Sequence, residues 1–384
     1  MNLDALPREW DVIVVGAGVA GAISAYRLAR GGLRVLLVEK SPWPRDKVCG
    51  GCVNAAALQA LARAGLGDIS QTGAAYSQLR LACGQRQVLL PLPAGMAVSR
   101  RRLDAILAER AVDAGAEFLP ATQALLGETQ GHGRRVTLRQ HHRRVAVTAK
   151  LVLGCDGLAS RLLREESPGD MNVARGSHIG VGTVVTAPPG AYEPGMIHMA
   201  CGSHGYVGLV SVENGELNIG AALDPAWVKR RGGPAAAVAE VLRTTAFPLF
   251  DALHDANWQG TPYLTRRRHR LGGERVLIVG DAAGYVEPFT GEGMGWALAG
   301  AAAVEPFALK SVDGWRDDLV ARWTARHNEW IRARQRGCRG ISMLLRRPRL
   351  IASLLPLINA VPGTIVPLTM RLNRDYGLDA MEAK

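Results

Sequence analysis

The sequence has 384 residues, 46 of them lysine or arginine and 34 aspartate or glutamate, and its formal net charge is +12. With 48% hydrophobic and 21% charged residues, the composition is typical of a packed globular protein and excludes a disordered chain. Aromatic residues make up only 5%, which argues against a stacking surface for single-stranded nucleic acid. The basic excess leaves three partners open: nucleic acid, an acidic lipid surface or an anionic cofactor.

Cysteine usage and the first residues indicate the compartment. Of six cysteines only Cys49 and Cys52 are close in sequence, which is no disulfide framework for a chain of this length and favours a reducing compartment. The first apolar run, residues 12–15, stops at a glycine, so it does not resemble a signal peptide. We therefore expect a cytoplasmic protein, with a reservation about the C-terminus.

The strongest motif lies in residues 11–40. A continuous apolar run predicts a buried parallel strand, a predicted helix follows over 19–30, and a second apolar strand over 34–38 ends at an acidic residue. Between strand and helix stands G-x-G-x-x-G, whose glycines serve a tight turn, close approach of a pyrophosphate and close helix packing. The acidic residue can accept hydrogen bonds from a ribose diol. The residues expected to bind this dinucleotide are Gly16, Ala17, Gly18, Gly21, Glu39 and Lys40.

Three later segments resemble the flavoprotein monooxygenase superfamily, which includes para-hydroxybenzoate hydroxylase and the geranylgeranyl reductases. Residues 98–104 read VSRRRLD, residues 151–161 read LVLGCDGLASR, and residues 275–300 read RVLIVGDAAGYVEPFTGEGMGWALAG. Their order and spacing match the superfamily over about residues 10–310. The resemblance implies an α/β fold: a Rossmann-like FAD-binding domain of the glutathione reductase type, an inserted antiparallel substrate sheet and a helical C-terminus. It also implies non-covalent FAD, with NAD(P)H as a transient reductant, because the chain has only one G-x-G-x-x-G.

The third segment supplies candidates for the flavin end of the cofactor. Asp281 ends a predicted strand, where it can bind a ribityl hydroxyl or cap the turn that follows. Gly291, Gly293 and Met294 open a predicted helix to about residue 303, whose amides can stabilise negative charge on a reduced flavin. Pro288 is expected to fix the loop beside the ring, or to be an ordinary turn proline.

Two further candidates have structural alternatives. Asp156 follows an apolar strand and can cap a short helix over residues 158–163 or hold a neighbouring arginine, whereas the resemblance places this motif near FAD and the nicotinamide. Arg100 can contact the FAD phosphate or ring, whereas Arg101 and Arg102 are consistent with a solvated helix start.

Residues 45–54 read RDKVCGGCVN and resemble the R-x-K-x-C-G-G stretch of the geranylgeranyl reductase-like branch. The resemblance places Arg45, Gly50 and Gly51 along the flavin. Cys52 makes a C-x-x-C with Cys49, for which a redox dithiol, a thiol near substrate and two packed small residues remain open. A zinc half-site is disfavoured, and no metal is expected, because no second ligand pair occurs at a suitable spacing.

Residues 176–264 alternate apolar with small or polar residues and predict the antiparallel sheet that forms the substrate wall. Its apolar character implies a hydrophobic or aromatic substrate. Candidates that can orient the substrate are His178, His198, His204, Tyr206 and Asn218, of which His178 and Tyr206, with Cys49, form the predicted catalytic set. Geranylgeranyl reductases often carry Tyr-x-Trp-x-x-Pro here. Tyr206-Val-Gly-Leu-Val lacks both the Trp and the Pro, and no Trp-x-Trp-x-Ile-Pro stretch of flavin halogenases occurs.

The C-terminus has a separate character. Residues 350–370 carry no charge but contain three prolines, which disfavours a straight transmembrane helix and favours short helices covering the substrate cavity or a membrane-facing segment. The last sixty residues hold eleven basic and four acidic residues, a net +7. Much of the basic excess therefore lies outside the FAD motifs, where it predicts peripheral membrane contact or a solvated surface.

The expected domains are FAD-binding over 1–70, 95–175 and 265–325, substrate-binding over 71–94 and 176–264, and helical over 326–384. The favoured function is an NAD(P)H- and oxygen-dependent monooxygenase acting on an apolar aromatic or polyketide-like molecule of secondary metabolism. Two alternatives stay open: a geranylgeranyl reductase-like enzyme that saturates alkenes, and a FAD-binding maturation partner of another protein. A nucleic-acid reader is not expected, because no helix concentrates base-reading residues.

Overall fold

The first apolar run of the chain forms the centre of a parallel sheet. The computed structural model describes residues 3–163, 169–287, 289, 291–361, 363, 367, 369–370, 373–374 and 376. Strand β1 (Glu9–Val15) pairs in parallel with β2 (Val35–Val38) on one side and with the end of β9 (Arg143–Gly154) on the other. The parallel part has the order β18–β9–β1–β2–β6, completed by β18 (Val276–Ile278) and β6 (Glu117–Leu119). This is the predicted Rossmann-like core.

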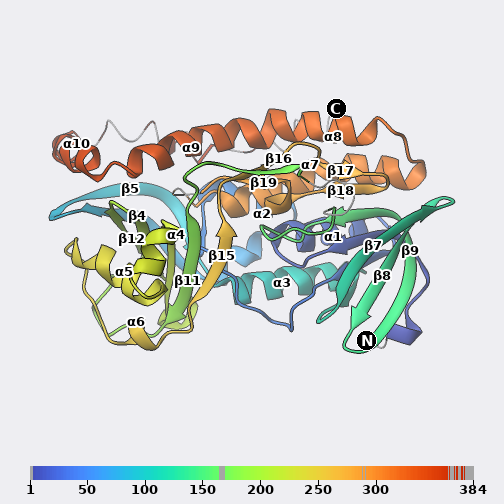
Figure 1. The fold of residues 1–384 in the computed structure, drawn as a ribbon, viewed down its shortest axis with the longest axis horizontal. Coiled ribbons are helices and arrows are strands. Elements are labelled where there is room, and N and C mark those ends of the chain that lie inside the picture. The colour runs from blue at the N-terminus through green and yellow to red at the C-terminus, as the bar shows by residue number, and fades with distance from the viewer. Residues whose placement is uncertain are drawn as a thin grey trace.

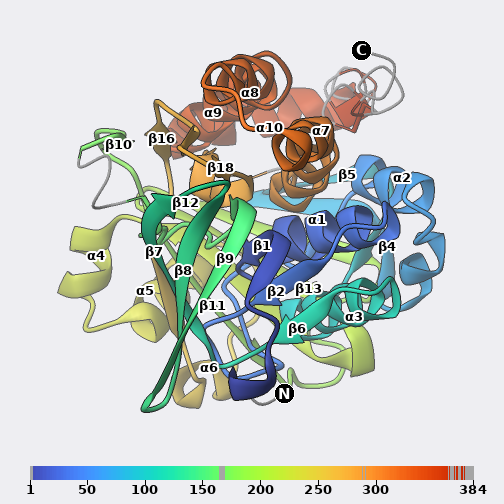
Figure 2. The ribbon, with the colours of Figure 1, turned by 90° about the vertical axis from the view of Figure 1, so that its right-hand side faces the viewer.

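Antiparallel strands and helices surround this core (Figures 1 and 2). Strand β9 continues outward into a meander with β7 and β8, and β17 pairs with β18 at the other edge. Helix α1 (Val19–Arg30) packs against both α3 and α7. The bounds are Gln123–Gln130 for β7, Gly133–Gln140 for β8, Gly272–Gly273 for β17, Arg100–Asp113 for α3 and Gly293–Asp313 for α7. Short 3-10 turns lie at Leu3–Ala5 and Gly280–Ala283.

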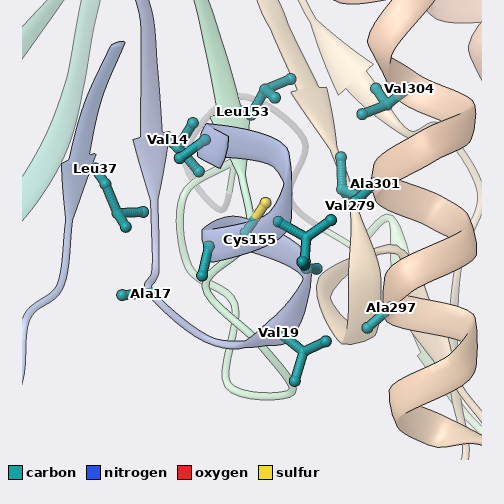
Figure 3. Packing of buried hydrophobic residues seen from close by; sticks show 14 of the residues in the cluster. Val14, Ala17, Val19, Leu37, Leu153, Cys155, Val279, Ala297, Ala301 and Val304 are labelled. Atoms are coloured by element: carbon teal, nitrogen blue, oxygen red, sulfur yellow. The ribbon is translucent and has the colours of Figure 1, made fainter. Parts of the chain in front are cut away.

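Small side chains let α7 approach the sheet and the first turn of α1 closely. Figure 3 shows Ala301 of α7 beside Val279 and Ala297 one helical turn away, and the parallel strands β1 and β2 contribute Val14 and Leu37 to the same core. All five side chains are at most 7% exposed. Alanine carries little side-chain bulk, so the backbones pack to a density typical of protein interiors.

A second, eight-stranded sheet has the order β15–β11–β14–β13–β12–β4–β5–β3. All neighbouring pairs are antiparallel except β12 and β4, which run parallel. The bounds are Cys52–Val53 (β3), Ala74–Cys83 (β4), Arg86–Ala97 (β5), Ile179–Val185 (β11), Met196–Gly202 (β12), Gly205–Ser211 (β13), Leu217–Leu223 (β14) and Gln259–Tyr263 (β15). Strand β5 runs through the expected domain boundary at residues 94 and 95, and β3 pairs with its end.

Smaller elements cover the outer side of this sheet and join the two sheets. Helix α5 packs against β12 and β13 and contacts α4 and α6. A third sheet has the order β10–β16–β19. The bounds are Ala55–Arg63 (α2), Gly67–Gln71 (η2), Met171–Val173 (β10), Glu213–Gly215 (η3), Pro225–Arg230 (α4), Pro234–Arg243 (α5), Ala252–Asp255 (α6), Arg266–Arg268 (β16) and Gly284–Tyr285 (β19).

The predicted helical C-terminus runs along the top of the molecule in Figure 1. Helix α8 (Leu319–His327), a π-helical turn (Asn328–Arg332) and α9 (Ala333–Leu345) follow one another directly, and α10 (Pro348–Ala360) packs against β5. Pro356 lies inside α10, which ends well before residue 370. Within the ranges described above, no helix is long and apolar enough to span a membrane.

Two predicted elements differ from the structure. Residues 158–163 form turns rather than the expected short helix, because the Asp156 carboxylate accepts the backbone N–H groups of Arg161 and Leu162 and tightens the chain locally. The helix that starts at Gly293 continues to Asp313 instead of ending near residue 303, because it stays packed on α1 and α8.

A substitution at Gly21 tests the packing of α1 on the sheet. A Cβ at Gly21 would lie 1.8 Å from the Gly16 carbonyl oxygen, so G21A must push the helix off the glycine turn. We expect the free energy of unfolding in urea to fall by about 2 kcal/mol or more. The control is G337A on α9, where a Cβ meets open space. This substitution should raise the free energy of unfolding by about 0.5–1 kcal/mol. Equal stability of G21A and wild type would contradict the close packing.

Candidate functional site

The glycine turn brings the start of α1 to the carboxyl edge of the parallel sheet. Gly16 has φ +104°, its N–H donates to the Val38 carbonyl over 2.7 Å, and a Cβ there would lie 2.4 Å from the Cys155 carbonyl oxygen. Only glycine fits that conformation and that space. The turn therefore directs the free N–H groups of α1 away from the sheet, as an anionic ligand requires.

Two arginines lie beside this turn. A Cβ on Gly18 would be 3.4 Å from Arg100 Nη2 and 3.6 Å from Arg45 Nη2, so both guanidinium groups border the space where a pyrophosphate would approach. Arg100 is only 7% exposed. Arg100 is therefore buried beside the turn, whereas Arg101 and Arg102, for which a solvated helix start was expected, are exposed.

Asp104 of α3 contacts both arginines and orients them. Its carboxylate, fully buried, accepts from Arg100 Nε at 2.9 Å and Nη2 at 2.7 Å, and lies 3.1 Å from Arg45 Nη1. Burial lowers the pKa of Arg100, but Asp104, with Cys49 and Asp281, raises it by more in total, so the group stays charged. Sequence reasoning missed Asp104, although its position four residues after Arg100 on a predicted helix is the spacing that brings two side chains together.

Glu39 is buried at the end of β2, at the position expected for a ribose contact. Its Oε2 accepts from the Ala17 N–H at 3.1 Å and lies 3.2 Å from Arg45 Nε, and its Oε1 accepts from the Ser41 N–H. Burial raises the pKa of Glu39, but Arg45 and the two backbone N–H groups together lower it by more. The pKa of Glu39 therefore lies below its usual value. The carboxylate is therefore ionised, and an ionised carboxylate has about four acceptor sites, enough to accept a ribose hydroxyl as well.

Farther along the edge, Lys47 and Asp281 form an ion pair with an Nζ–Oδ2 distance of 3.2 Å. Asp281 is the second residue of the 3-10 turn after β18, and Lys47 lies near Gly157, so the D-G and G-D motifs meet here. Asp156 instead directs Oδ2 at the turn that it stabilises. Lys40 is exposed and lines a separate pocket with Arg139.

A row of glycines on the second sheet carries the cysteine-containing loop. Gly208 and Gly182 both lie opposite Gly220 in neighbouring strands, and a Cβ on Gly220 would be 3.0 Å from the Cys49 carbonyl oxygen. Asn218 donates from Nδ2 to that same carbonyl over 3.0 Å. The missing side chains let the loop lie flat on the sheet.

The two cysteines of this loop differ in environment. Both are free, Cys49 being partly exposed and Cys52 buried with its thiol donating to the Gly50 carbonyl. Burial raises the pKa of Cys52 well above its usual value, which disfavours a reactive thiolate. Cys49 lines the central cavity, as do Gly50 and Cys52. Gly51 has φ +72° and abuts Asn218.

These elements enclose one cavity of about 380 Å³ that reaches from the glycine turn to the C-terminal helices. At one end it is lined by Gly18, Arg100 and Asp281 and by Gly291, Gly293 and Met294 of the third motif. At the other end the walls are aliphatic, from β4, β5, β12, α9 and α10: Leu81, Leu90, Ile197, Met199, Leu345, Ile351, Leu355 and Ile358. The polar dinucleotide end and the apolar end are thus continuous. Pro288 lies outside the described residues.

Of the predicted catalytic histidine and tyrosine, only the tyrosine reaches the cavity. Tyr206 is 6% exposed, lines the cavity and packs edge-on against Phe289 with ring centroids 5.3 Å apart. Burial raises its pKa, so the hydroxyl keeps its proton. His178 is not among the cavity-lining residues, and its Nδ1 lies 3.3 Å from Glu287 Oε1.

His178 belongs to a buried ionic cluster instead. Glu287 is fully buried and also lies 2.7 Å from Arg346 Nη2 of the segment after α9. Burial raises the pKa of Glu287, but His178 and Arg346 lower it by more. The cluster connects the start of β11 and the loop before α7 to the C-terminal helices. His198 and His204 also lie outside the cavity lining, packed against Tyr192 and Trp227 respectively.

Comparison with known proteins identifies the dinucleotide. A family model described as FAD binding domain matches residues 9–317. The chain belongs to this FAD-binding family. Because the match covers the parallel sheet and all three later motifs, FAD is the cofactor for which the polar end of the cavity is built.

Relatives and structural neighbours divide between two activities. The chain is 28% identical over 327 residues to digeranylgeranylglycerophospholipid reductase 2 of Methanothermobacter thermautotrophicus, covering 80% of each chain. It is 28% identical over 366 residues to menaquinone reductase of Mycolicibacterium smegmatis, covering 89% of this chain and 86% of the relative. The structure of the flavin-dependent brominase Bmp2 superposes with a TM-score of 0.75 at 16% identity, covering 95% and 93%. A geranylgeranyl bacteriochlorophyll reductase-like protein of Thermoplasma acidophilum gives 0.72 at 18%, covering 95% and 98%.

The residues present fit FAD. The Gly18 turn leaves space that two charged guanidinium groups border, and Glu39 lies one strand away for the ribose. Gly293 begins α7 at the cavity, where its backbone N–H groups can bind the flavin edge. Bound FAD would supply oxidation–reduction chemistry, which no side chain of the site can perform. Within the described part of the chain, no three or more His, Cys, Asp or Glu residues gather as a metal site would require.

Replacing Arg45 tests the phosphate end. We expect R45Q to weaken FAD binding by about tenfold to a hundredfold, because one charge-assisted hydrogen bond contributes about 1.5–3 kcal/mol. Titration of apoprotein with FAD, followed by quenching of flavin fluorescence, measures this. R101Q is the matched control, since that side chain is exposed on the first turn of α3, and it should bind FAD like wild type. Equal losses in both variants would contradict a specific role for Arg45.

Proposed function

We propose that the protein is an FAD-dependent reductase that saturates a carbon–carbon double bond in an isoprenoid-like lipid. The carrying observation is the single cavity whose polar end holds the dinucleotide motifs and whose other end is walled by aliphatic side chains. Such walls exclude water from an alkene without offering it a polar partner. The names of the two reductase relatives, which match over at least four fifths of their own length, support this choice.

The chain's own groups can supply the proton that alkene saturation requires. A hydride delivered to one carbon must be matched by a proton on the other. Cys49 and Tyr206 both line the cavity and carry groups that can donate a proton. Because burial raises the pKa of Tyr206, its hydroxyl is a reluctant donor, and the partly exposed Cys49 is the better one. Asn218 holds Cys49 in place by donating a hydrogen bond from Nδ2 to the backbone carbonyl of Cys49.

An NAD(P)H- and oxygen-dependent monooxygenase acting on an aromatic molecule is the second candidate. Tyr206, Tyr285 and Phe289 line the cavity beside the loop before α7 and offer aromatic faces to such a substrate. The order of the two candidates differs from the expectation drawn from the sequence. The reason is that the aliphatic wall contributed by α9 and α10, invisible in the motifs, extends the cavity beyond the size of one aromatic ring.

Anaerobic turnover distinguishes the candidates. The protein is loaded with FAD, reduced with NADPH or NADH without oxygen, and mixed with a geranylgeranyl lipid that carries no quinone. We expect flavin reoxidation and a product that gains two hydrogen atoms in mass spectrometry. A product that gains one oxygen atom, formed only in air, would instead establish the monooxygenase. Absence of turnover with free lipids and phenols in both atmospheres would favour the maturation partner.

The proton donor is tested by a pair of cysteine variants. C49A should lower kcat by about a hundredfold, the usual contribution of a positioned acid, while the flavin absorbance spectrum stays unchanged. C52A is the matched control three residues away, and it should keep kcat within about twofold because its buried thiol donates to a backbone carbonyl. If C49A turned over like C52A, the assignment to Cys49 would be wrong.

A further inference from the structure

The C-terminal helices expose large apolar side chains on the surface. Met343 is 54% exposed, Leu344 37%, Leu350 42%, Leu357 65% and Val361 57%. We refer to these five residues as the C-terminal apolar face. Scattered apolar side chains are normal on a protein surface, but five exposed within 19 residues, on two helices that contact each other and at the end of the second, indicate an interaction site.

Helix α10 presents apolar side chains on its inner side and also on its outer side. Its inner side presents the buried Ile351 and Leu355 to the cavity, whereas Leu350 and Leu357 point outward. Residues 350–361 carry no charged side chain. A surface helix of a water-soluble protein normally has a charged outer face, whereas beyond Arg349 the exposed polar residues of α10 are only Ser353 and Asn359, which suits a medium less polar than water.

Exposed arginines border this face. Arg336 and Arg339 lie on α9, and Arg347 and Arg349 flank the start of α10. Between residues 326 and 361 the chain has eight arginines and one acidic residue, Glu329. Basic side chains beside an outward apolar face are the combination that binds anionic lipid headgroups while apolar groups enter the interface.

We propose that the C-terminal apolar face and its bordering arginines form a docking surface for an anionic lipid bilayer, on which the protein lies without spanning it. A second copy of the chain is the less suitable occupant, because a two-fold contact would bring two sets of arginines together. In Figure 1 the α9–α10 end lies at the upper edge of the molecule, over β4 and β5. The docking does not depend on the proposed function.

The position of the surface has a consequence for substrate access, which does rest on the proposed function. Leu344 both belongs to the C-terminal apolar face and lines the cavity. The cavity wall therefore reaches the protein surface where the bilayer would lie, so a lipid can enter the cavity from the membrane side without crossing water.

Co-sedimentation with vesicles tests the docking. The FAD-loaded wild type should sediment with vesicles of equal parts phosphatidylglycerol and phosphatidylcholine, bind phosphatidylcholine vesicles much more weakly, and dissociate as salt rises. L350Q/L357Q should weaken binding to the mixed vesicles by about tenfold or more. R347Q/R349Q should lose about fivefold for each arginine and most of the preference for phosphatidylglycerol.

The controls carry the same substitutions at other exposed sites. L125Q/L249Q changes two side chains that are each 41% exposed on other elements, and R316Q/R322Q changes exposed arginines around α8. Both should bind vesicles like wild type. Failure of the wild type to bind phosphatidylglycerol vesicles, or equal losses in the control variants, would overturn the proposal.

A tryptophan at position 357 gives an independent measurement. Brominated lipids in phosphatidylglycerol vesicles should quench the tryptophan fluorescence of L357W more strongly than that of the wild type. Sedimentation velocity without lipid tests the alternative occupant, a second copy of the chain. A dimer that L350Q/L357Q converts to monomers, together with no additional fluorescence quenching in L357W, would assign the face to a second copy and overturn membrane docking. Neither readout depends on turnover, so failure of the reductase assay leaves this result standing.

Discussion

The close contact between the Gly16–Gly21 turn and the end of β9 is the constraint on which the site depends. Gly16 touches the carbonyl of Cys155, and Gly21 touches the carbonyl of Gly16, at distances that no other residue allows. This contact sets the start of α1 beside the carboxyl edge of the parallel strands. Every polar group of the dinucleotide end, from Glu39 to Asp281, is positioned relative to that edge.

Buried charge is then distributed in matched pairs around the turn. Arg45 lies between Glu39 and Asp104, and Arg100 makes a two-pronged contact with Asp104. Removing one partner from such a cluster leaves a charge buried without compensation, which is strongly destabilising. The cluster thereby holds two guanidinium groups in one orientation beside Gly18. Because moving either guanidinium group would leave a buried carboxylate without its partner, both groups are already oriented to bind a phosphate before it arrives.

The second sheet and the C-terminal helices convert this dinucleotide site into a cavity. The glycine row across β11, β14 and β13 lets the loop that carries Cys49 lie flat, and α9 and α10 close the far side. The ionic cluster of His178, Glu287 and Arg346 ties these helices to the loop before α7. The same helices present apolar side chains inward and outward, so the element that completes the cavity also forms the proposed membrane surface.

Local patterns determined much of this protein before its structure. The spacing of glycines and apolar residues over 11–40 specified β1, α1 and β2 almost to the residue, because turn geometry and strand burial are dictated by near neighbours. The FAD-binding fold followed from the order of four such motifs. Residues 45–54 were predicted to lie along the flavin, but nothing local distinguished the partly exposed Cys49 from the buried Cys52.

What only the tertiary structure decided are the contacts between distant segments. Asp104 is joined to Arg45 across 59 positions, and Glu287 to Arg346 across 59 as well. His178 is a plausible catalyst in a predicted sheet, yet its side chain meets a carboxylate from the loop before α7 instead of the cavity. The aliphatic end of the cavity is built from β4, β5, β12, α9 and α10 together. A pattern read along the chain cannot place such contacts, because they depend on how separate elements pack in space.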